Sequence, residues 1–354
     1  MPTDVILKAD PDYSEVGAEV RCTSPRAMGF HMPAEWAPHD MTVMMFPARH
    51  NVSTYADNWY EAGCVTWAAA VRAVAEFEPV LVIAHEGEAG VARRYCGSDV
   101  EIIEMPIDDP WPRDTGPSIL INGKGDRCAA GYVFNGYGNK GPHDRDKLFK
   151  ARICRHLGLP IHPSPLVFEG GSITVDGEGT VITTKSCLLN ANRNPGMTIG
   201  QVEDELKEQL GASKVIWLEN GLNPRTDGHV DGICAFVGPA TVMLQHADDE
   251  MPVQAEICRN ARRVLETETD AKGRALTIID LPLGKSKSTY HVNFYMPNGG
   301  VVVPTCGDQA LNDRALGIIR EAFPKRRVVG IEGAAIAGGG GGGIHCITQP
   351  VPAA

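Results

Sequence analysis

The chain has 354 residues, of which 43% are hydrophobic and 22% are charged, as is typical of a soluble globular protein. Its formal net charge of −11 argues against nucleic acid as a partner, because phosphate binding needs a basic surface. An acidic protein is better suited to a small cationic ligand.

The sequence also bears on the compartment. No apolar run reaches the ~18 residues of a membrane span, and no basic segment followed by an apolar core marks a signal peptide. The ten cysteines include no Cys-x-x-Cys pair, which excludes a zinc ribbon and a thioredoxin-like motif. We therefore predict a cytoplasmic protein with reduced thiols and no membrane partner.

Helical and extended patterns alternate along the chain. Amphipathic periodicity predicts five helices, at 57–77, 145–157, 198–210, 252–267 and 308–323. Runs of apolar and β-branched residues predict strands after four of them, at 80–84, 214–218, 275–279 and 327–331. A helix followed by a strand therefore recurs along the chain.

Three pairs of short strands joined by glycine-containing turns lie between these units. The predicted hairpins are 172–175 with 180–184, 232–237 with 240–245, and 292–296 with 301–303. Hairpins argue against a purely parallel sheet, and roughly five similar units favour radial repetition. We predict one α/β domain, residues 34–354, after an N-terminal arm, residues 1–33.

Four segments place polar side chains where a predicted loop meets a strand. They are Trp-Pro-Arg-Asp-Thr-Gly-Pro at 111–117, Phe-Glu-Gly-Gly-Ser at 168–172, Thr-Asp-Gly-His-Val-Asp at 226–231, and the glycine run 338–343 that leads to Ile-His-Cys at 344–346. Functional residues concentrate on loops held by a rigid scaffold. Glycines before a cysteine let the backbone approach a ligand closely.

Together these segments supply a thiol, an imidazole and several carboxylates. The Cys346 thiolate is a candidate nucleophile, and His229 can move protons to a leaving group and to water. Asp231 points to the same side as His229 if both lie on an extended strand. Several carboxylates suit a planar guanidinium ion and would repel the oxyanion of a peptidase reaction.

Each of these residues also has a structural interpretation. Cys346 could be a small buried apolar side chain, and His229 a structural histidine. Asp114 could cap a turn, and Glu169 could form a salt bridge at a strand end. The His-x-Asp pair that His229 forms with Asp231 could belong to a metal site, although no second histidine pair supports it and we predict no metal or cofactor.

The segment Gly-Tyr-Gly-Asn-Lys-Gly at 136–141 matches the dinucleotide-binding pattern G-x-G-x-x-G. That pattern requires a helix to begin within the motif. Here Pro142 follows at once, so we interpret the segment as a glycine-rich loop.

The four polar segments, in this order, resemble the agmatine deiminase family, which is related to the peptidylarginine deiminases. Further matching stretches are Met-Pro-Ala-Glu-Trp at 32–36, Leu-Leu-Asn-x-Asn-Arg-Asn-Pro at 188–195 and Asn-Phe-Tyr at 293–295. The resemblance implies a fivefold pseudosymmetric α/β propeller of ββαβ-type units, the pentein fold. It also implies a homo-oligomeric hydrolase that converts agmatine to N-carbamoylputrescine and ammonia without a cofactor.

The resemblance assigns roles to five residues. Cys346 would attack the guanidinium carbon to give a covalent thiouronium intermediate, and His229 would protonate the leaving ammonia and then activate water. Asp114 and Asp231 would bind the guanidinium nitrogens, and Glu169 would orient His229 and the substrate. The further residues expected to bind the substrate are Trp111, Gly170, Arg225, Asp227 and Gly343.

Two departures from the family pattern bear on specificity. Gly343 stands where the family has asparagine, and Arg225 stands in a segment that is usually acidic. Arginine favours a substrate with a distal carboxylate, so a guanidino acid or arginine is an alternative substrate to agmatine. The same residues are also compatible with an amidinotransferase and with a catalytically silent guanidine-binding protein.

Overall fold

The computed structural model describes residues 13–50, 59–284, 290–333, 336 and 341–354. The helices in this part of the chain are α1 (Trp59–Ala75), α2 (Ala89–Cys96), α3 (Pro112–Thr115), α4 (Gly136–Asn139), α5 (Phe149–Leu157), α6 (Lys185–Leu188), α7 (Ile199–Leu210), α8 (Pro252–Thr267) and α9 (Gln309–Ala322). Short 3-10 turns are η1 (Tyr13–Val16), η2 (Arg26–Met28), η4 (Asp146–Leu148), η5 (Gly170–Ser172), η6 (Pro224–Thr226), η7 (Val230–Gly232) and η8 (His345–Ile347). None of the described helices is long and apolar enough to cross a membrane.

The strands, in chain order, are β1 (His39–Met45), β2 (Val80–Ala84), β3 (Glu101–Glu104), β4 (Ser118–Ile121), β5 (Arg127–Val133), β6 (Ile161–Val167), β7 (Ile173–Val175), β8 (Thr180–Thr184), β9 (Lys214–Leu218), β10 (Cys234–Gly238), β11 (Thr241–His246), β12 (Thr277–Pro282), β13 (Gly300–Thr305), β14 (Arg327–Glu332) and β15 (Thr348–Pro352). Within the described residues they form five sheets, ordered β15-β1-β2-β3, β4-β5-β6, β7-β8-β9, β10-β11-β12 and β13-β14.

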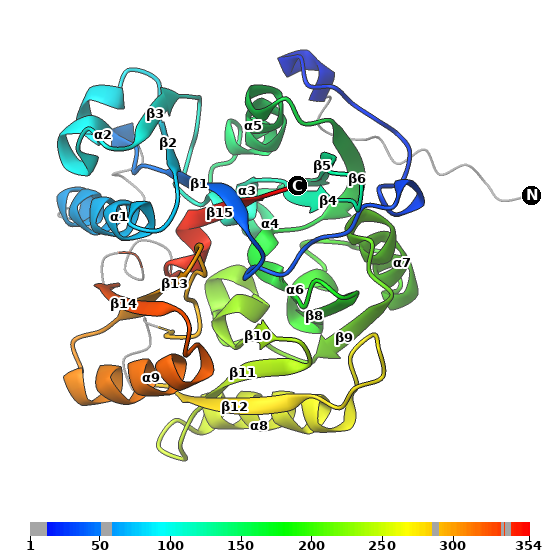
Figure 1. Ribbon diagram of the computed structural model, residues 1–354. Helices are drawn as coiled ribbons and strands as arrows, with labels where there is room; N and C mark the ends of the chain where they lie inside the picture. The colour runs from blue at the N-terminus through cyan, green and yellow to red at the C-terminus, as the bar shows by residue number, and fades with distance from the viewer. Residues whose placement is uncertain (1–12, 51–58, 285–289, 334–335, 337–340) are drawn as a thin grey trace, which may run out of the picture.

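Each sheet contains a parallel strand pair whose two strands are joined by one of the long helices, and in the first sheet β3 adds a second parallel pair with β2. The parallel pairs are β1 with β2, β5 with β6, β8 with β9, β11 with β12, and β13 with β14. In four sheets an antiparallel strand is added on the other side of the pair. The mixed α/β architecture follows from this repeated unit, and in Figure 1 the long helices α1, α5, α7, α8 and α9 lie at the periphery.

The predicted helices are present with ends that differ by a few residues. Helix α7 begins with a capping box, in which Thr198 and Gln201 satisfy each other's backbone N–H groups. Helices α5 and α7 each end at a glycine with positive φ, Gly158 and Gly211, which a residue with a Cβ adopts only with strain. The predicted start of the first helix, at 57–58, lies outside the described residues.

The third predicted hairpin is wrong. Residues 292–296 form no strand, and only an isolated bridge joins Tyr295 to Val302. Strand β13 instead pairs in parallel with β14, with Val302 opposite Val329. Tyr295 and Val302 exchange two backbone hydrogen bonds on the other edge of β13, and this is all that remains of the predicted hairpin.

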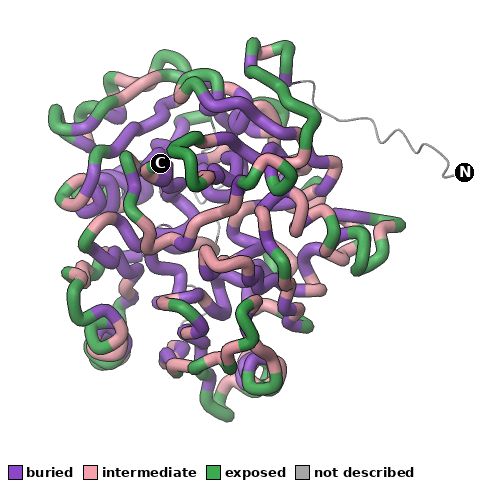
Figure 2. The backbone as a smooth tube through the Cα atoms, turned by 45° about the vertical axis from the view of Figure 1, so that its right-hand side comes forward, coloured by how far each residue is buried: buried purple, intermediate pink, exposed green. Residues whose placement is uncertain are grey.

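The apolar side chains of the strands and inner helix faces form the core. All five residues of β2 are buried, and Trp67 of α1 is fully buried against Trp59 and Trp111. Buried backbone runs through the interior in Figure 2, whereas exposed residues gather on the outer helices and turns. The described part of the N-terminal segment joins this core, since Tyr13 is buried and donates a hydrogen bond to the Tyr132 carbonyl.

Candidate active site

Cys346 lies in η8, immediately before β15. It is 7% exposed, and it lines a cavity of about 310 Å³. A Cβ on Gly342 would lie 3.0 Å from the Cys346 sulfur and 3.1 Å from the Trp111 ring. Glycine at 342 therefore leaves the thiol access to the cavity. The earlier glycines of the run, 338–340, lie outside the described residues.

His229 precedes η7, which contains Asp231. The two residues therefore do not lie on an extended strand as predicted, but the 3-10 turn still brings both to the cavity. A Cβ on Gly171 would lie 2.7 Å from His229 Nδ1 and 2.7 Å from Asp231 Oδ2. The close approach of this glycine thus allows an imidazole and a carboxylate to face the same space.

Glu169 lies behind His229 and is fully buried. Its Oε2 accepts a hydrogen bond from His229 Nε2 at 3.2 Å, and its Oε1 accepts one from Arg193 Nε at 2.7 Å. Burial acts to raise the pKa of Glu169, but the bonds from His229 and Arg193 outweigh it, and the pKa is lowered. Glu169 is therefore a carboxylate that fixes the His229 ring and leaves Nδ1 toward Asp114, whose Oδ1 lies 3.8 Å away.

The charge of His229 follows from these neighbours. Burial lowers the pKa of the imidazole, but the Asp114 carboxylate and hydrogen bonding with Cys187 and Glu169 raise it well above its ordinary value. His229 is consequently an imidazolium at neutral pH, which suits a proton donor.

Asp114, in α3, faces the cavity from another side. Its Oδ1 accepts a hydrogen bond from the Gly171 N–H at 2.9 Å, and its Oδ2 accepts one from the Tyr137 hydroxyl at 3.0 Å. Burial raises the pKa of this carboxyl, and Asp231 adds to the effect, although His229 opposes it. An incoming cation would favour the ionised form of Asp114.

Asp231 approaches the nucleophile directly. Its Oδ2 lies 3.5 Å from the Cys346 sulfur and 2.9 Å from His345 Nδ1. Burial acts to raise the pKa of Asp231, but His345 outweighs it and the pKa is lowered. Burial, followed by the charges of Asp231 and Asp114, raises the pKa of the Cys346 thiol well above its usual range.

The structure brings most of the predicted site residues to the cavity. Those that line it are Trp111, Asp114, Arg225, His229, Asp231 and Cys346. Glu169 reaches the site through His229. Asp227 does not line the cavity, because its carboxylate binds Lys140 Nζ at 2.6 Å and Arg193 at 3.1 Å.

The two predicted glycines act through packing. A Cβ on Gly170 would lie 2.2 Å from the Arg113 carbonyl oxygen, so Gly170 lets α3 and η5 pack closely. A Cβ on Gly343 would lie 2.6 Å from Asn293 Oδ1. This structure therefore has no room for a side chain at 343 unless Asn293 moves.

Sequence reasoning did not assign roles to several residues that complete the site. They are Glu35, Tyr137, Cys187, Arg193, Asn293 and His345. Asn293 Oδ1 lies 3.4 Å from the Cys346 sulfur, and its amide donates to the Asp231 carbonyl at 3.1 Å. Glu35, Arg193 and Asn293 belong to stretches that carried the family resemblance, which was the only signal for them.

A metal-ligand geometry exists at one place among the described residues. Ligand atoms of Glu169, Cys187 and His229 lie within 4.8 Å of one another, and all three side chains are buried. The Arg193 guanidinium already neutralises Glu169, and a second cation beside it would be repelled. His229 and Asp231 use separate partners, Glu169 and His345, so they do not form the metal pair considered from sequence.

Comparisons with known proteins identify the family. The model of the Porphyromonas-type peptidyl-arginine deiminase family matches residues 31–352. The chain therefore belongs to that family.

Several similar proteins are named agmatine deiminase. The agmatine deiminase of Ectopseudomonas mendocina is 40% identical, over 94% of this chain and 98% of the relative, and that of Pseudomonas fluorescens is 39% identical over the same shares. The solved agmatine deiminase of Enterococcus faecalis is 31% identical and matches with a TM-score of 0.88 over 95% of this chain and 99% of its own.

Proposed function

We propose that this protein is a guanidine deiminase that hydrolyses agmatine to N-carbamoylputrescine and ammonia. The observation that carries the proposal is the convergence of Cys346, His229, Asp114 and Asp231 on one cavity. A thiol, an imidazolium and two carboxylates are the groups that attack on a guanidinium carbon requires. The names of the similar proteins support agmatine as the substrate.

In the first half of the reaction Asp114 and Asp231 hold the guanidinium nitrogens. The positive charge of the substrate lowers the pKa of the Cys346 thiol, which gives its proton to water, and the thiolate attacks the guanidinium carbon. A C–N bond breaks, and His229 gives its proton to the departing ammonia. A thiouronium group on Cys346 remains.

In the second half His229, now neutral, takes a proton from water. The resulting hydroxide attacks the thiouronium carbon, and the C–S bond breaks to release the ureido product and the thiolate. Glu169 holds the His229 ring through both halves, since it binds Nε2 and not the nitrogen that faces Asp114. Trp111 lines the cavity and shields it from water.

The charged residues of the cavity lining suit two kinds of substrate tail. Asp109 favours the ammonium of agmatine, whereas Arg225 and Lys140 favour a carboxylate. Arg225 is exposed, so water screens its charge. A guanidino acid or arginine is therefore the second candidate, and agmatine the first.

Ammonia release by the purified protein, without added metal, tests the proposal across agmatine, arginine and several guanidino acids. We expect the highest kcat/KM with agmatine. A preference for a carboxylate-tailed guanidine would indicate that Arg225 determines the substrate specificity. Ammonia release only on addition of an amine acceptor would indicate an amidinotransferase, and binding without turnover a silent guanidine-binding protein.

We further propose that the five sheet units are arranged as a fivefold pseudosymmetric α/β propeller, the pentein fold, in one domain, residues 34–354, after an arm, residues 1–33. The repeated strand–helix–strand units support it. We also propose a cytoplasmic homo-oligomer. All ten cysteines are free thiols, which suits a reducing compartment. Light scattering of the purified protein tests the oligomer.

A further inference from the structure

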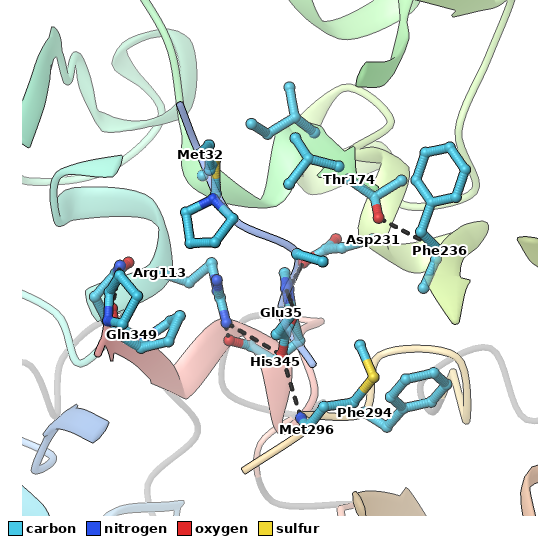
Figure 3. Close-up of a pocket in the computed structure, with 18 of the residues that line it drawn as sticks. Met32, Glu35, Arg113, Thr174, Asp231, Phe236, Phe294, Met296, His345 and Gln349 are labelled. Atoms are coloured by element: carbon cyan, nitrogen blue, oxygen red, sulfur yellow. Dashed lines mark hydrogen bonds and ion pairs between the residues drawn. The ribbon is translucent and has the colours of Figure 1, made fainter. Parts of the chain in front are cut away.

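A second cavity, of about 50 Å³, lies on the other side of Asp231. Among the described residues, Asp231 alone lines both this cavity and the larger one containing Cys346. The smaller cavity is also lined by Glu35, Arg113 and His345, whose side chains lie close together in Figure 3. Charged groups therefore gather behind the carboxylate that faces the nucleophile.

His345 joins two carboxylates in this cluster. Its Nδ1 lies 2.9 Å from Asp231 Oδ2, and its Nε2 lies 3.0 Å from Glu35 Oε2. Both ring nitrogens face carboxylate oxygens, which only accept hydrogen bonds, so an imidazolium donates to both. His345 is 9% exposed, and little water competes for these bonds.

Glu35 is itself held in place. Its Oε1 lies 3.6 Å from Arg113 and accepts a hydrogen bond from the Met296 N–H at 3.3 Å. Arg113 Nε in turn donates to the His345 carbonyl at 3.2 Å. Arg113 therefore holds the backbone of His345, and Glu35 holds the Nε2 side of its ring.

The same Asp231 oxygen that accepts from His345 lies 3.5 Å from the Cys346 sulfur. Burial and Arg113 lower the pKa of His345, but Glu35 and Asp231 outweigh them and raise it, which is consistent with an imidazolium. The hydrogen bond from His345 therefore fixes the position of the Asp231 oxygen that lies beside the thiol. Without that bond the Asp231 side chain could rotate away from a ligand.

We propose that His345 is a positioning residue that, held by Glu35, orients Asp231 toward a guanidinium group in the cavity. This inference rests on the proposed function, because it takes a guanidine as the ligand. It makes residue 35, in the segment before β1, part of the active site.

Two variants of His345 separate its two hydrogen bonds. In His345→Asn the amide nitrogen takes the place of Nδ1 and can donate to Asp231 but does not reach Glu35. In His345→Gln the amide nitrogen takes the place of Nε2 and can donate to Glu35 but not to Asp231. Each variant loses the imidazolium charge and one hydrogen bond, so each is the control for the other.

The readout is alkylation of Cys346 by iodoacetamide, followed by mass spectrometry of the peptide that contains it. Guanidinium chloride at millimolar concentration is the probe, and it should protect Cys346 by occupying the cavity. We expect the guanidinium concentration that gives half-maximal protection to rise about 10- to 100-fold in His345→Gln. In His345→Asn it should stay within about threefold of wild type. With agmatine, the loss in His345→Gln should appear mainly as a raised KM.

Equal losses of guanidinium protection in the two variants, with equal falls in Tm, would show a merely structural role for His345 and overturn the inference. Unchanged protection in both would also overturn it. Protection of the wild-type protein by guanidinium without turnover of agmatine would refute the proposed function alone, and the two variants would still decide the role of His345. No protection of the wild-type protein would overturn both proposals.

Discussion

Asp114 and Asp231 face the same cavity from two different surroundings. Asp114 accepts hydrogen bonds from a backbone N–H and the Tyr137 hydroxyl, both neutral donors. Asp231 accepts from His345, which is held as a cation between two carboxylates. Both side chains are buried, yet the pKa of Asp114 is raised and that of Asp231 is lowered.

The difference shows that burial alone does not set the charge of a carboxyl group in this site. Burial is the largest influence on the pKa of both residues. At Asp231 the cationic partner outweighs burial, and the pKa is lowered. The free site therefore holds one firmly ionised carboxylate beside the thiol and one that gains most from an incoming cation. We infer that Asp231 is already ionised when the guanidinium binds, and that Asp114 binds it more strongly once the cation is present.

The comparison bears on catalysis only if the thiol beside Asp231 is the nucleophile. We expect Cys346→Ala to lower kcat by about 10⁴-fold or more, because the covalent route is lost. The Tm should change little, since one small buried side chain replaces another. Cys258→Ala, at a buried thiol of α8, is the control and should keep full activity. Turnover that persists in Cys346→Ala would rule out the covalent route.

Exchanging each carboxylate for an amide tests the comparison itself. We expect Asp114→Asn and Asp231→Asn each to lower kcat/KM for agmatine by about 10²- to 10³-fold, because each removes a charge that faces the guanidinium. Their effects on the free energy of unfolding should differ in size. Asp231→Asn should lower the free energy of unfolding by about 2 kcal/mol, because the His345 cation loses a partner.

Asp114→Asn should lower the free energy of unfolding at neutral pH less than Asp231→Asn does, because removal of a costly buried charge offsets the loss of a partner for His229. A carboxyl with a raised folded-state pKa loses stabilisation as pH rises through its titration, so an ionised Asp114 is a cost at pH 7. Denaturant unfolding at pH 7 measures both variants. Asp204→Asn, at an exposed carboxylate of α7, is the control. Equal destabilisation by the two active-site variants would contradict the assigned charge difference.

The network behind Asp231 should make the protein sensitive to acid. The pKa of Glu35 is lowered to about 2, because His345 and Arg113 outweigh burial. This stabilisation is present above the unfolded-state pKa near 4.5 and is lost as pH falls toward 2. We expect the free energy of unfolding of wild type to fall between pH 5 and pH 3 by about 1–2 kcal/mol more than that of Glu35→Gln.

Thermal melts across this pH range check the prediction, with Glu61→Gln on the exposed face of α1 as the control. Parallel pH profiles for wild type and Glu35→Gln would show that Glu35 is not held as a carboxylate by this network. His345 has a raised pKa, so its own stabilising contribution is present in acid and is lost as pH rises through its folded-state pKa.

Substitution of Arg225 should give the smallest effect. Arg225 lies at an exposed position of the cavity lining, where water and salt screen its charge. We expect Arg225→Glu to lower KM for agmatine by about two- to fivefold and to raise it for a guanidino acid. Arg320→Glu, on the exposed face of α9, makes the same charge change elsewhere. An unchanged ratio between the two substrates would leave Arg225 without a role in specificity.

Much of the local structure was predictable because it depends on neighbouring residues. Strands 80–84 and 214–218 have the predicted bounds, since each is a short apolar run between turn residues. The predicted hairpin at 292–303 is reduced to one bridge, between Tyr295 and Val302, while Val329 pairs with Val302 on its other side. No local pattern contains the pairing of Val302 with Val329.

For the site too, some features were predictable from the sequence and others were not. The sequence by itself determined which chemical groups are present, because the glycine-rich and polar segments around Asp114, Glu169, His229 and Cys346 could be identified from composition and spacing. Only the tertiary structure decided their charges and orientations. Glu35 and His345 lie near opposite ends of the chain, and their contact exists only after folding. Charge in a buried site depends on distances of a few ångströms between such groups, and sequence order does not encode those distances.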